Sequence, residues 1–384
     1  MTTKLKKLIG NSFIEIADAI ESGNFGKKVR IGLTTLGSEH GPDTLIEGAL
    51  AAKAANEDIE IILLGKGHEA FESYESDCES DAHEKMEELL KEKKIDACVT
   101  NHYNFPIGVS TVGRVTTPAK GKDMMITTTT GTSATNRTEA MFKNAIYGII
   151  AAKAVGKENP TVGILNLDSA RAVERGLKTL KENGYDINFS ESKRSDGGNI
   201  MRGNDLILGS SDVMVMDTLT GNIMMKMFST YTTGGTYEAS GYGYGPGIGF
   251  DYDDTILILS RASGVPVIKN AILYAADLVK NDLSRIIKEE YKKVKAAGYD
   301  KIIESFQEKR VTESQEEITV PEKEIVTESI SGIDVLDLDV ACEELWKNDI
   351  YAETGMGCTG PIISINEKNL EKGKAILKEA GFIS

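Results

Sequence analysis

The sequence lacks the short patterns that mark several common metal and redox sites. Its four cysteines include no C-x-x-C pair, and its four histidines all precede residue 103 without any H-E-x-x-H spacing. Zinc sites and thioredoxin-like redox sites depend on such spacings. We therefore expect no metal and no cofactor, and four scattered thiols suit a reducing compartment.

Long hydrophobic runs and an excess of basic residues are also missing. No apolar stretch approaches the length of a membrane span, and the first 22 residues resemble an amphipathic helix without a signal-peptide core. The formal net charge is −15. Nucleic-acid binding requires a basic surface that releases counterions, so we expect no nucleic acid as partner. Because a membrane span and a signal peptide are missing from the pattern, we also expect no membrane partner and a cytoplasmic location.

Apolar strand patterns alternate with helical patterns from residue 29 onward. Strands are expected at 29–35, 59–64 and 95–100, with helices over 44–55 and 82–93. Such alternation is typical of parallel strands covered by helices. The predicted fold class is therefore α/β, with mostly parallel sheet and helices on both faces.

The alternation resumes in a second half, which either continues the same sheet or forms a second lobe across a cleft. A strand is expected at 161–165, a helix with Thr220 as its N-cap, and one long amphipathic helix over 269–294. The threonine-rich run MITTTTGTSATNRTEA (125–140) is interpreted as a polar loop that leads into a helix.

Two domains and a connector are predicted along the chain. Residues 1–303 form the large α/β domain, and 304–330 are a charged connector poor in large apolar residues. Residues 331–384 form a small module with a helix over 338–346 and a strand at 361–365.

Two glycine-bearing segments are candidate loops. The loop GSEHGPD (37–43) lies between a strand and a helix, where backbone N–H groups suit an anion, although it also fits a simple turn. The run 234–249 holds seven glycines without G-x-G-x-x-G spacing, so it indicates either a ligand loop or a surface loop. Basic and amide side chains near later helix starts could neutralise a phosphate, although each alone is most simply solvated. The phosphate-binding candidates are His40, Gly41, Asn222, Lys226, Lys269 and Asn270.

The segment TGMGCTGP (354–361) places Cys358 among three glycines. Bare backbone lets a substrate approach the thiol, and N–H groups of Gly357, Thr359 and Gly360 could stabilise an oxyanion. No basic residue in the loop explains a thiolate, so His40 or His102 elsewhere in the fold, or a partner, would have to activate it. From the residues alone, a nucleophile and a tight turn both stay open. Two other cysteines, Cys98 and Cys342, lie in apolar patterns and are expected in the core.

Three segments resemble the phosphate acyltransferase family of phospholipid synthesis. They are IGLTTLGSEHGPDTLIEGALAA, LTGNIMMKMF and SRASGVPVIKNAILYA, and the similarity covers roughly residues 28–290. It implies a three-layer α/β/α fold related to phosphotransacetylases, and acyl transfer from a thioester to inorganic phosphate.

Together with TGMGCTGPIISI, the whole chain resembles the family of component C alpha subunits of glycine/sarcosine/betaine reductase complexes. This resemblance implies a beta subunit and a selenoprotein, component A, as partners. It also implies that Cys358 carries an acetyl thioester, which inorganic phosphate cleaves to acetyl phosphate. Two alternatives stay open: a stand-alone phosphate acyltransferase that uses a carrier thioester, and a non-catalytic scaffold for a catalytic beta subunit.

Overall fold

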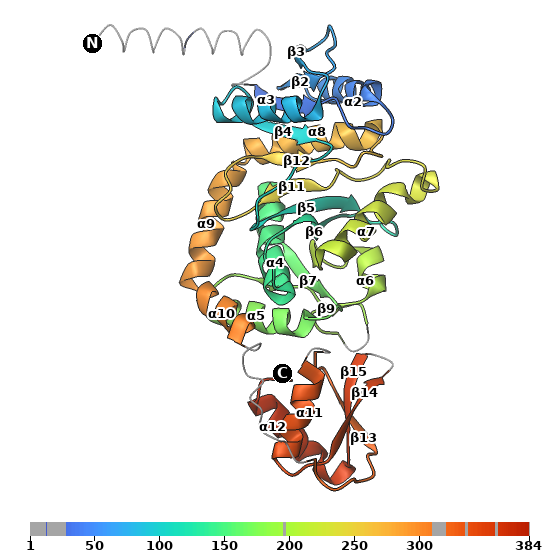
Figure 1. The fold of residues 1–384 in the computed structure, drawn as a ribbon, viewed down its shortest axis with the longest axis vertical. Helices are drawn as coiled ribbons and strands as arrows, with labels where there is room; N and C mark the ends of the chain where they lie inside the picture. Colours follow the sequence, from blue (N-terminus) through green and yellow to red (C-terminus); the bar gives the residue numbers. More distant parts are fainter. Residues whose placement is uncertain are drawn as a thin grey trace, which may run out of the picture.

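A computed structural model describes Phe13 and residues 28–194, 197–308, 320–334, 337–357 and 360–383 (Figure 1). The described strands form two sheets. The larger has twelve strands, eleven of them along one hydrogen-bonded path, so the two α/β halves share a continuous sheet. Its order is β3-β2-β1-β4-β12-β11-β5-β6-β10-β7-β8, with β9 paired to β7.

Strands of the first half run parallel, and helices cover both of their faces. Side chains of α2 and α8 share one hydrophobic cluster with one face, and those of α3 share a second cluster with the other. The strands are β1 (Val29–Thr34), β2 (Ile59–Gly65), β3 (Glu72–Glu75), β4 (Ala97–Thr100) and β12 (Ile256–Ile258). The helices are α2 (Pro42–Ala55), α3 (Glu79–Lys91) and α8 (Val265–Lys280).

The second half is also parallel and joins the first through the antiparallel strands β5 (Val109–Thr116) and β11 (Gly245–Ile248). Its strands are β6 (Asp123–Thr132), β7 (Thr161–Leu165), β8 (Asn188–Phe189), β9 (Ile200–Met201) and β10 (Val213–Val215). Helices α4 (Arg137–Ala154), α5 (Ala170–Glu182), α9 (Leu283–Ala296) and α10 (Tyr299–Glu308) pack on one face. Helices α6 (Gly203–Leu208) and α7 (Thr218–Thr230) pack on the other, and η1 (Tyr231–Thr233) follows α7. The mostly parallel, three-layer α/β/α prediction is thus confirmed.

Two predicted elements are wrong. The first half of the threonine-rich run is not a loop: residues 125–132 belong to β6, where Thr127, Thr128 and Thr129 are fully buried between β5 and β10. Threonine is β-branched and suits a strand, and the hydroxyls of Thr128 and Thr129 donate to the carbonyls of Thr111 and Tyr244. The long helix is also broken, because Asp282 adopts a left-handed φ of 56° and its side chain caps α9 by accepting from the Arg285 N–H.

The C-terminal module has its own sheet and hydrophobic core (Figure 1). Strand β15 pairs antiparallel with both β13 and β14, and α11 and α12 pack on this sheet. The elements are β13 (Glu328–Ser331), α11 (Leu338–Lys347), β14 (Ala352–Gly357), β15 (Gly360–Ile365), η3 (Glu367–Asn369) and α12 (Leu370–Glu379). Helix α10 reaches Glu308 and β13 begins at Glu328, so both ends of the predicted connector lie in regular structure.

Candidate functional site

The loops that follow β1 and β12 contact the glycine-rich loop (234–249) at the end of the sheet where these two strands finish. The backbone N–H of Glu39 donates to the Arg261 carbonyl at 2.8 Å. On the other side of the same turn, the Glu238 N–H donates to the Ala262 carbonyl at 2.9 Å. The rings of His40 and Tyr237 meet edge to face, with centroids 6.3 Å apart. Residues about 200 positions apart in the sequence therefore form one polar surface, at the carboxyl ends of parallel strands where ligands bind in α/β folds.

Helix α7 adds Asn222 and Lys226 to this surface. Its N-cap is Asp217, not Thr220 as the sequence suggested: the Asp217 carboxylate accepts from the Thr220 N–H at 3.0 Å. Gly221 lies so close to β6 that a Cβ on it would sit 1.8 Å from the Thr128 carbonyl oxygen. This close approach lets the Asn222 side-chain amide donate to the Thr129 carbonyl at 3.0 Å, which fixes the helix against the sheet.

Glu238 is a buried carboxylate beside Lys226, and the sequence analysis missed it. Its side chain is 1% exposed, and it accepts a hydrogen bond from the Ser263 hydroxyl at 3.1 Å. The Lys226 ammonium lies 4.0 Å from the carboxylate and 5.7 Å from the centroid of the Tyr244 ring. Burial raises the pKa of Glu238 above its usual value, although hydrogen bonds from Ser260 and Ser263 and the charge of Lys226 oppose this. A carboxylate within a glycine-rich loop was the only signal in the sequence.

Helix α8 contributes the last two predicted phosphate ligands. The Asn270 amide donates to the Gly241 carbonyl at 3.0 Å, so it holds the glycine-rich loop against the helix. Lys269 precedes it on α8, with a half-buried side chain that forms no ion pair among the described residues. Gly41, at the N-cap of α2, has a left-handed φ of 81° and no atom within 4 Å of an added Cβ. The structure thus gathers His40, Gly41 and Lys226 around the joined loops, and Asn270 supports one of them, whereas Asn222, on the same helix as Lys226, bonds to β6.

A hydroxyl and histidine network lies at the end of neighbouring strand β4. The Thr34 hydroxyl donates to the Thr100 hydroxyl at 2.8 Å, and His83 lies 3.1 Å from the same oxygen. Burial lowers the pKa of His83, which favours the neutral ring. The Asn101 side chain donates to the Leu36 carbonyl at 2.7 Å, while its buried Oδ1 finds no partner among the described residues. His102, considered as an activating base, is exposed.

The cysteine loop is framed by the hairpin of the C-terminal module. Strands β14 and β15 pair through to their ends, with Gly357 opposite Gly360. Cys358 and Thr359, predicted as nucleophile and oxyanion donor, lie outside the described residues. Cys98 and Cys342 are buried, as predicted, and burial raises the pKa of Cys342 to about 11.

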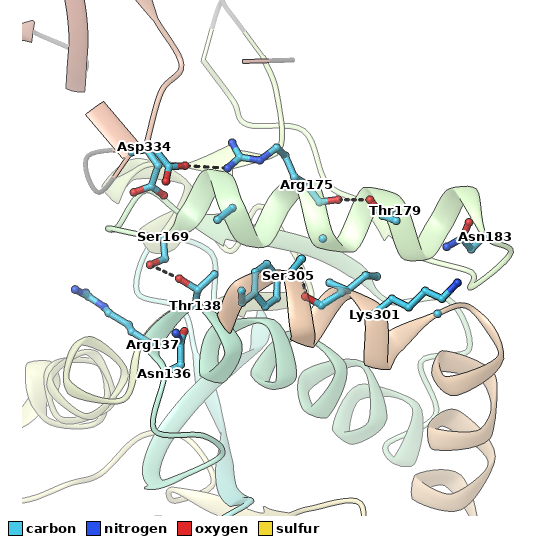
Figure 2. Close-up of a pocket in the computed structure, with 16 residues that line it drawn as sticks. Asn136, Arg137, Thr138, Ser169, Arg175, Thr179, Asn183, Lys301, Ser305 and Asp334 are labelled. Carbon is cyan, nitrogen blue, oxygen red and sulfur yellow. Dashed lines mark hydrogen bonds and ion pairs between the residues drawn. The ribbon is translucent and has the colours of Figure 1, made fainter. Parts of the chain in front are cut away.

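A cavity of about 620 Å³ lies where the large domain meets the C-terminal module. Figure 2 shows α5 along one side of it, with Lys301 and Ser305 of α10 opposite. The Arg175 guanidinium donates to the Asp337 carboxylate at 3.0 Å, which joins the two parts of the chain. None of the predicted site residues within the described ranges lines this cavity. Across the described ranges, no group of three or more His, Cys, Asp or Glu side chains is placed to hold a metal ion. Nor does any helix in those ranges have the length and apolar character needed to cross a membrane.

A family model described as "Fatty acid synthesis protein" matches residues 29–364. The chain belongs to the fatty acid synthesis protein family. This family member is 60% identical over 383 residues to the alpha subunit of component C of the glycine/sarcosine/betaine reductase complex from Peptoclostridium acidaminophilum, covering 99% of both chains. It is 32% identical over 235 residues to a phosphate acyltransferase from Thermotoga petrophila, covering 52% of this chain and 67% of the other.

A branched-chain phosphotransacylase from Enterococcus faecalis V583 aligns in structure with a TM-score of 0.47 and 15% identity, covering 65% of this chain and 99% of the other. The sequence relatives confirm both resemblances inferred from the quoted segments. The family model reaches Ser364, so it extends beyond residues 28–290 into β15 of the C-terminal module.

Proposed function

We propose that this chain is an acyltransferase subunit that carries a two-carbon acyl group as an acetyl thioester on Cys358 and releases it as acetyl phosphate. The carrier that delivers the acyl group is a selenoprotein, and a beta subunit completes the component. Similarity over 99% of the chain to a component C alpha subunit supports this assignment, as does the partial similarity to phosphate acyltransferases.

One structural observation carries the phosphate half of the proposal. His40, in the loop after β1, and Lys226, on α7, come from separate segments, yet His40 contacts Tyr237 and Lys226 lies 4.0 Å from Glu238, both in the glycine-rich loop. A chain of net charge −15 repels phosphate unless cations gather locally, and Lys226 supplies one at this surface.

The reaction balances without a cofactor. An oxygen of hydrogen phosphate attacks the thioester carbonyl carbon on Cys358, and backbone N–H groups stabilise the oxyanion. The carbon–sulfur bond then breaks, the acetyl group leaves on phosphate, and the phosphate proton passes to the thiolate. Lys226 offsets the negative charge of phosphate during the attack.

The proposed thiol and phosphate site lie on different parts of the chain. Figure 1 shows β14 and β15 beyond α5 and α10, at the opposite end of the long axis from α2. Nineteen residues separate the end of α10 at Glu308 from the start of β13 at Glu328. The last of these residues belong to the module, because the Thr327 N–H donates to the Ile365 carbonyl at 3.1 Å and the Asn366 amide donates to the Ile325 carbonyl at 2.9 Å. Acetyl transfer to phosphate therefore requires the module to approach the site.

Exposed apolar side chains on α7 offer a surface for the proposed beta subunit. Leu219, Ile223 and Met227 of α7 and Tyr231, the first residue of η1, follow one another at intervals of four residues and are 71%, 48%, 57% and 48% exposed. Residues at this spacing lie on one face of a helix. A partner there would lie next to Lys226 and could help close the phosphate site.

The proposal is tested by following acetyl phosphate release from the full-length chain with its beta subunit and carrier. Loss of release in Cys358→Ser, together with slow release in Lys226→Gln, is the expected result. Full activity of Cys358→Ser with acyl-carrier thioesters would favour a stand-alone phosphate acyltransferase. Release that survives both substitutions would place the chemistry on the beta subunit and leave this chain as a scaffold.

A further inference from the structure

Glu238 holds a fixed position at the predicted phosphate site. Besides the Ser263 hydroxyl, its carboxylate lies 3.5 Å from the Tyr244 hydroxyl. Its backbone carbonyl accepts from the Gly264 N–H at 2.9 Å. A Cβ on Gly264 would lie 2.6 Å from the Tyr237 ring and 3.1 Å from the Glu238 carbonyl oxygen. The turn therefore packs tightly on both sides of Glu238, and its carboxylate has little room to move.

Its partner is much less constrained. The Lys226 side chain is 55% exposed, against 1% for Glu238, and the two charged groups are 4.0 Å apart. A flexible four-carbon stem lets an ammonium turn from one acceptor to another. An anion that enters from solvent can therefore contact the exposed Lys226 ammonium, while the Glu238 carboxylate remains buried on the protein side of that ammonium.

We propose that Glu238 is the resident counter-ion of Lys226, and that an entering phosphate takes Lys226 from it, which makes Glu238 a positioning residue of the phosphate site. This inference rests on the proposed function, since it takes Lys226 as a phosphate ligand. When the anion binds, the carboxylate loses its counter-charge and faces a second negative charge, so it takes up a proton from solvent.

The other charged and titratable groups around Glu238 do not replace Lys226. Tyr244 faces the carboxylate from the same loop, and burial raises the pKa of its hydroxyl, so it stays neutral. Arg261, on the neighbouring turn, directs its guanidinium to Glu79 of α3 at 3.5 Å. His40 contacts the ring of Tyr237, one residue before Glu238. Lys226 is the cation that the described residues place nearest to the carboxylate.

Sulfate binding to the full-length chain, measured by calorimetry between about pH 5 and pH 8, tests the inference. Sulfate keeps its charge over this range, so the anion adds no titration of its own. Glu238→Gln retains an acceptor for Ser263 but removes the charge. We expect sulfate to bind this variant about tenfold more tightly than the wild type near pH 8, a scale set by one partly screened unit charge. The difference should shrink toward pH 5, where the wild-type carboxyl gains its proton more readily.

Matched variants separate the possible results. Glu290→Gln removes another carboxylate that is 2% exposed, paired with Lys153 and Lys293 far from this loop in sequence, and should leave sulfate affinity unchanged. His40→Gln, in parallel, removes the imidazole ring that contacts Tyr237. Sulfate binding that depends on Lys226 but is unaffected by Glu238→Gln would refute the inference and leave the phosphate site standing. Binding that ignores Lys226→Gln would refute the site itself.

A second variant covers the case in which Glu238→Gln does not fold. Ser263→Ala removes a hydrogen bond that lowers the pKa of Glu238. The Glu238 carboxyl then keeps its proton up to a higher pH. Sulfate affinity, which falls as this carboxyl ionises, should therefore fall at a higher pH than in the wild type. An unshifted profile in a folded Ser263→Ala chain would count against the inference.

Discussion

Replacing Gly221 by alanine tests whether close packing of α7 positions the predicted phosphate ligands. A Cβ at this position would lie 1.8 Å from the Thr128 carbonyl oxygen and 2.8 Å from its carbonyl carbon. These are backbone atoms of a central strand, so no side-chain rotation relieves the overlap. Since ordinary contact begins near 3.4 Å, the helix must withdraw from β6 by more than an ångström.

The expected loss of stability follows from opposing contributions. Alanine in place of glycine favours a helix by about 1 kcal/mol. Overpacking a tight interface costs about 1–3 kcal/mol or more, and loss of the hydrogen bond from Asn222 to the Thr129 carbonyl adds about 1 kcal/mol. We expect the free energy of unfolding of Gly221→Ala to fall by about 1–3 kcal/mol.

Denaturant unfolding, read together with sulfate affinity, measures both consequences. Gly203→Ala is the matched control, because Gly203 also lies in a helix and no atom lies within 4 Å of its added Cβ. The control should be as stable as the wild type or slightly more so, with unchanged sulfate binding. A Gly221→Ala chain that matched this control in both measurements would refute the role assigned to the close packing.

Three further predictions concern the charge of the site, the partner surface and acid stability. Lys226→Gln should raise the KM for phosphate about ten- to a hundredfold, the scale of a lost charge-assisted hydrogen bond, and an unchanged KM in release assays would contradict the site. Ile223→Glu should weaken co-purification of the beta subunit, whereas Leu50→Glu, at a 37% exposed position on α2, should not; equal effects would exclude α7 as the contact. Burial alone would raise the pKa of Asp212, but hydrogen bonds from Lys157 and the Thr161 backbone and side chain hold it below its usual value. This carboxylate therefore stabilises the fold above about pH 4 and loses that effect as pH falls through its folded pKa. Asp212→Asn should lower the melting temperature near pH 7, and the melting temperatures of variant and wild type should converge in acid. A difference that stays constant with pH would contradict this role of Asp212.

Much of the large domain could be predicted because its strands are short apolar runs between helical patterns. Strand β1 and helix α2 lie where the pattern predicted them. Strand β6 did not stand out, because its threonines count as polar until buried hydroxyls find partners, as Thr129 does with the Tyr244 carbonyl at 2.8 Å. The break between α8 and α9 depends on a left-handed aspartate, which helical periodicity does not reveal.

The site could be predicted in residue types but not in its arrangement. His40 and Lys226 stood out because each lies near a predicted strand end. Glu238 did not, because an acidic residue in a glycine-rich loop is usually solvated. Its burial depends on Ser263 and Tyr244, contacts that exist only in the folded chain.

The central claim is that Cys358 carries the acyl group, and mass spectrometry tests it most directly. The full-length chain is incubated with acetyl phosphate, alone and with its beta subunit, so that the reaction runs backward, and peptides are then mapped. We predict an acetyl adduct on the peptide 354–361 that is absent from Cys358→Ser. No adduct, even with the beta subunit present, would contradict it and place the acyl site on another chain.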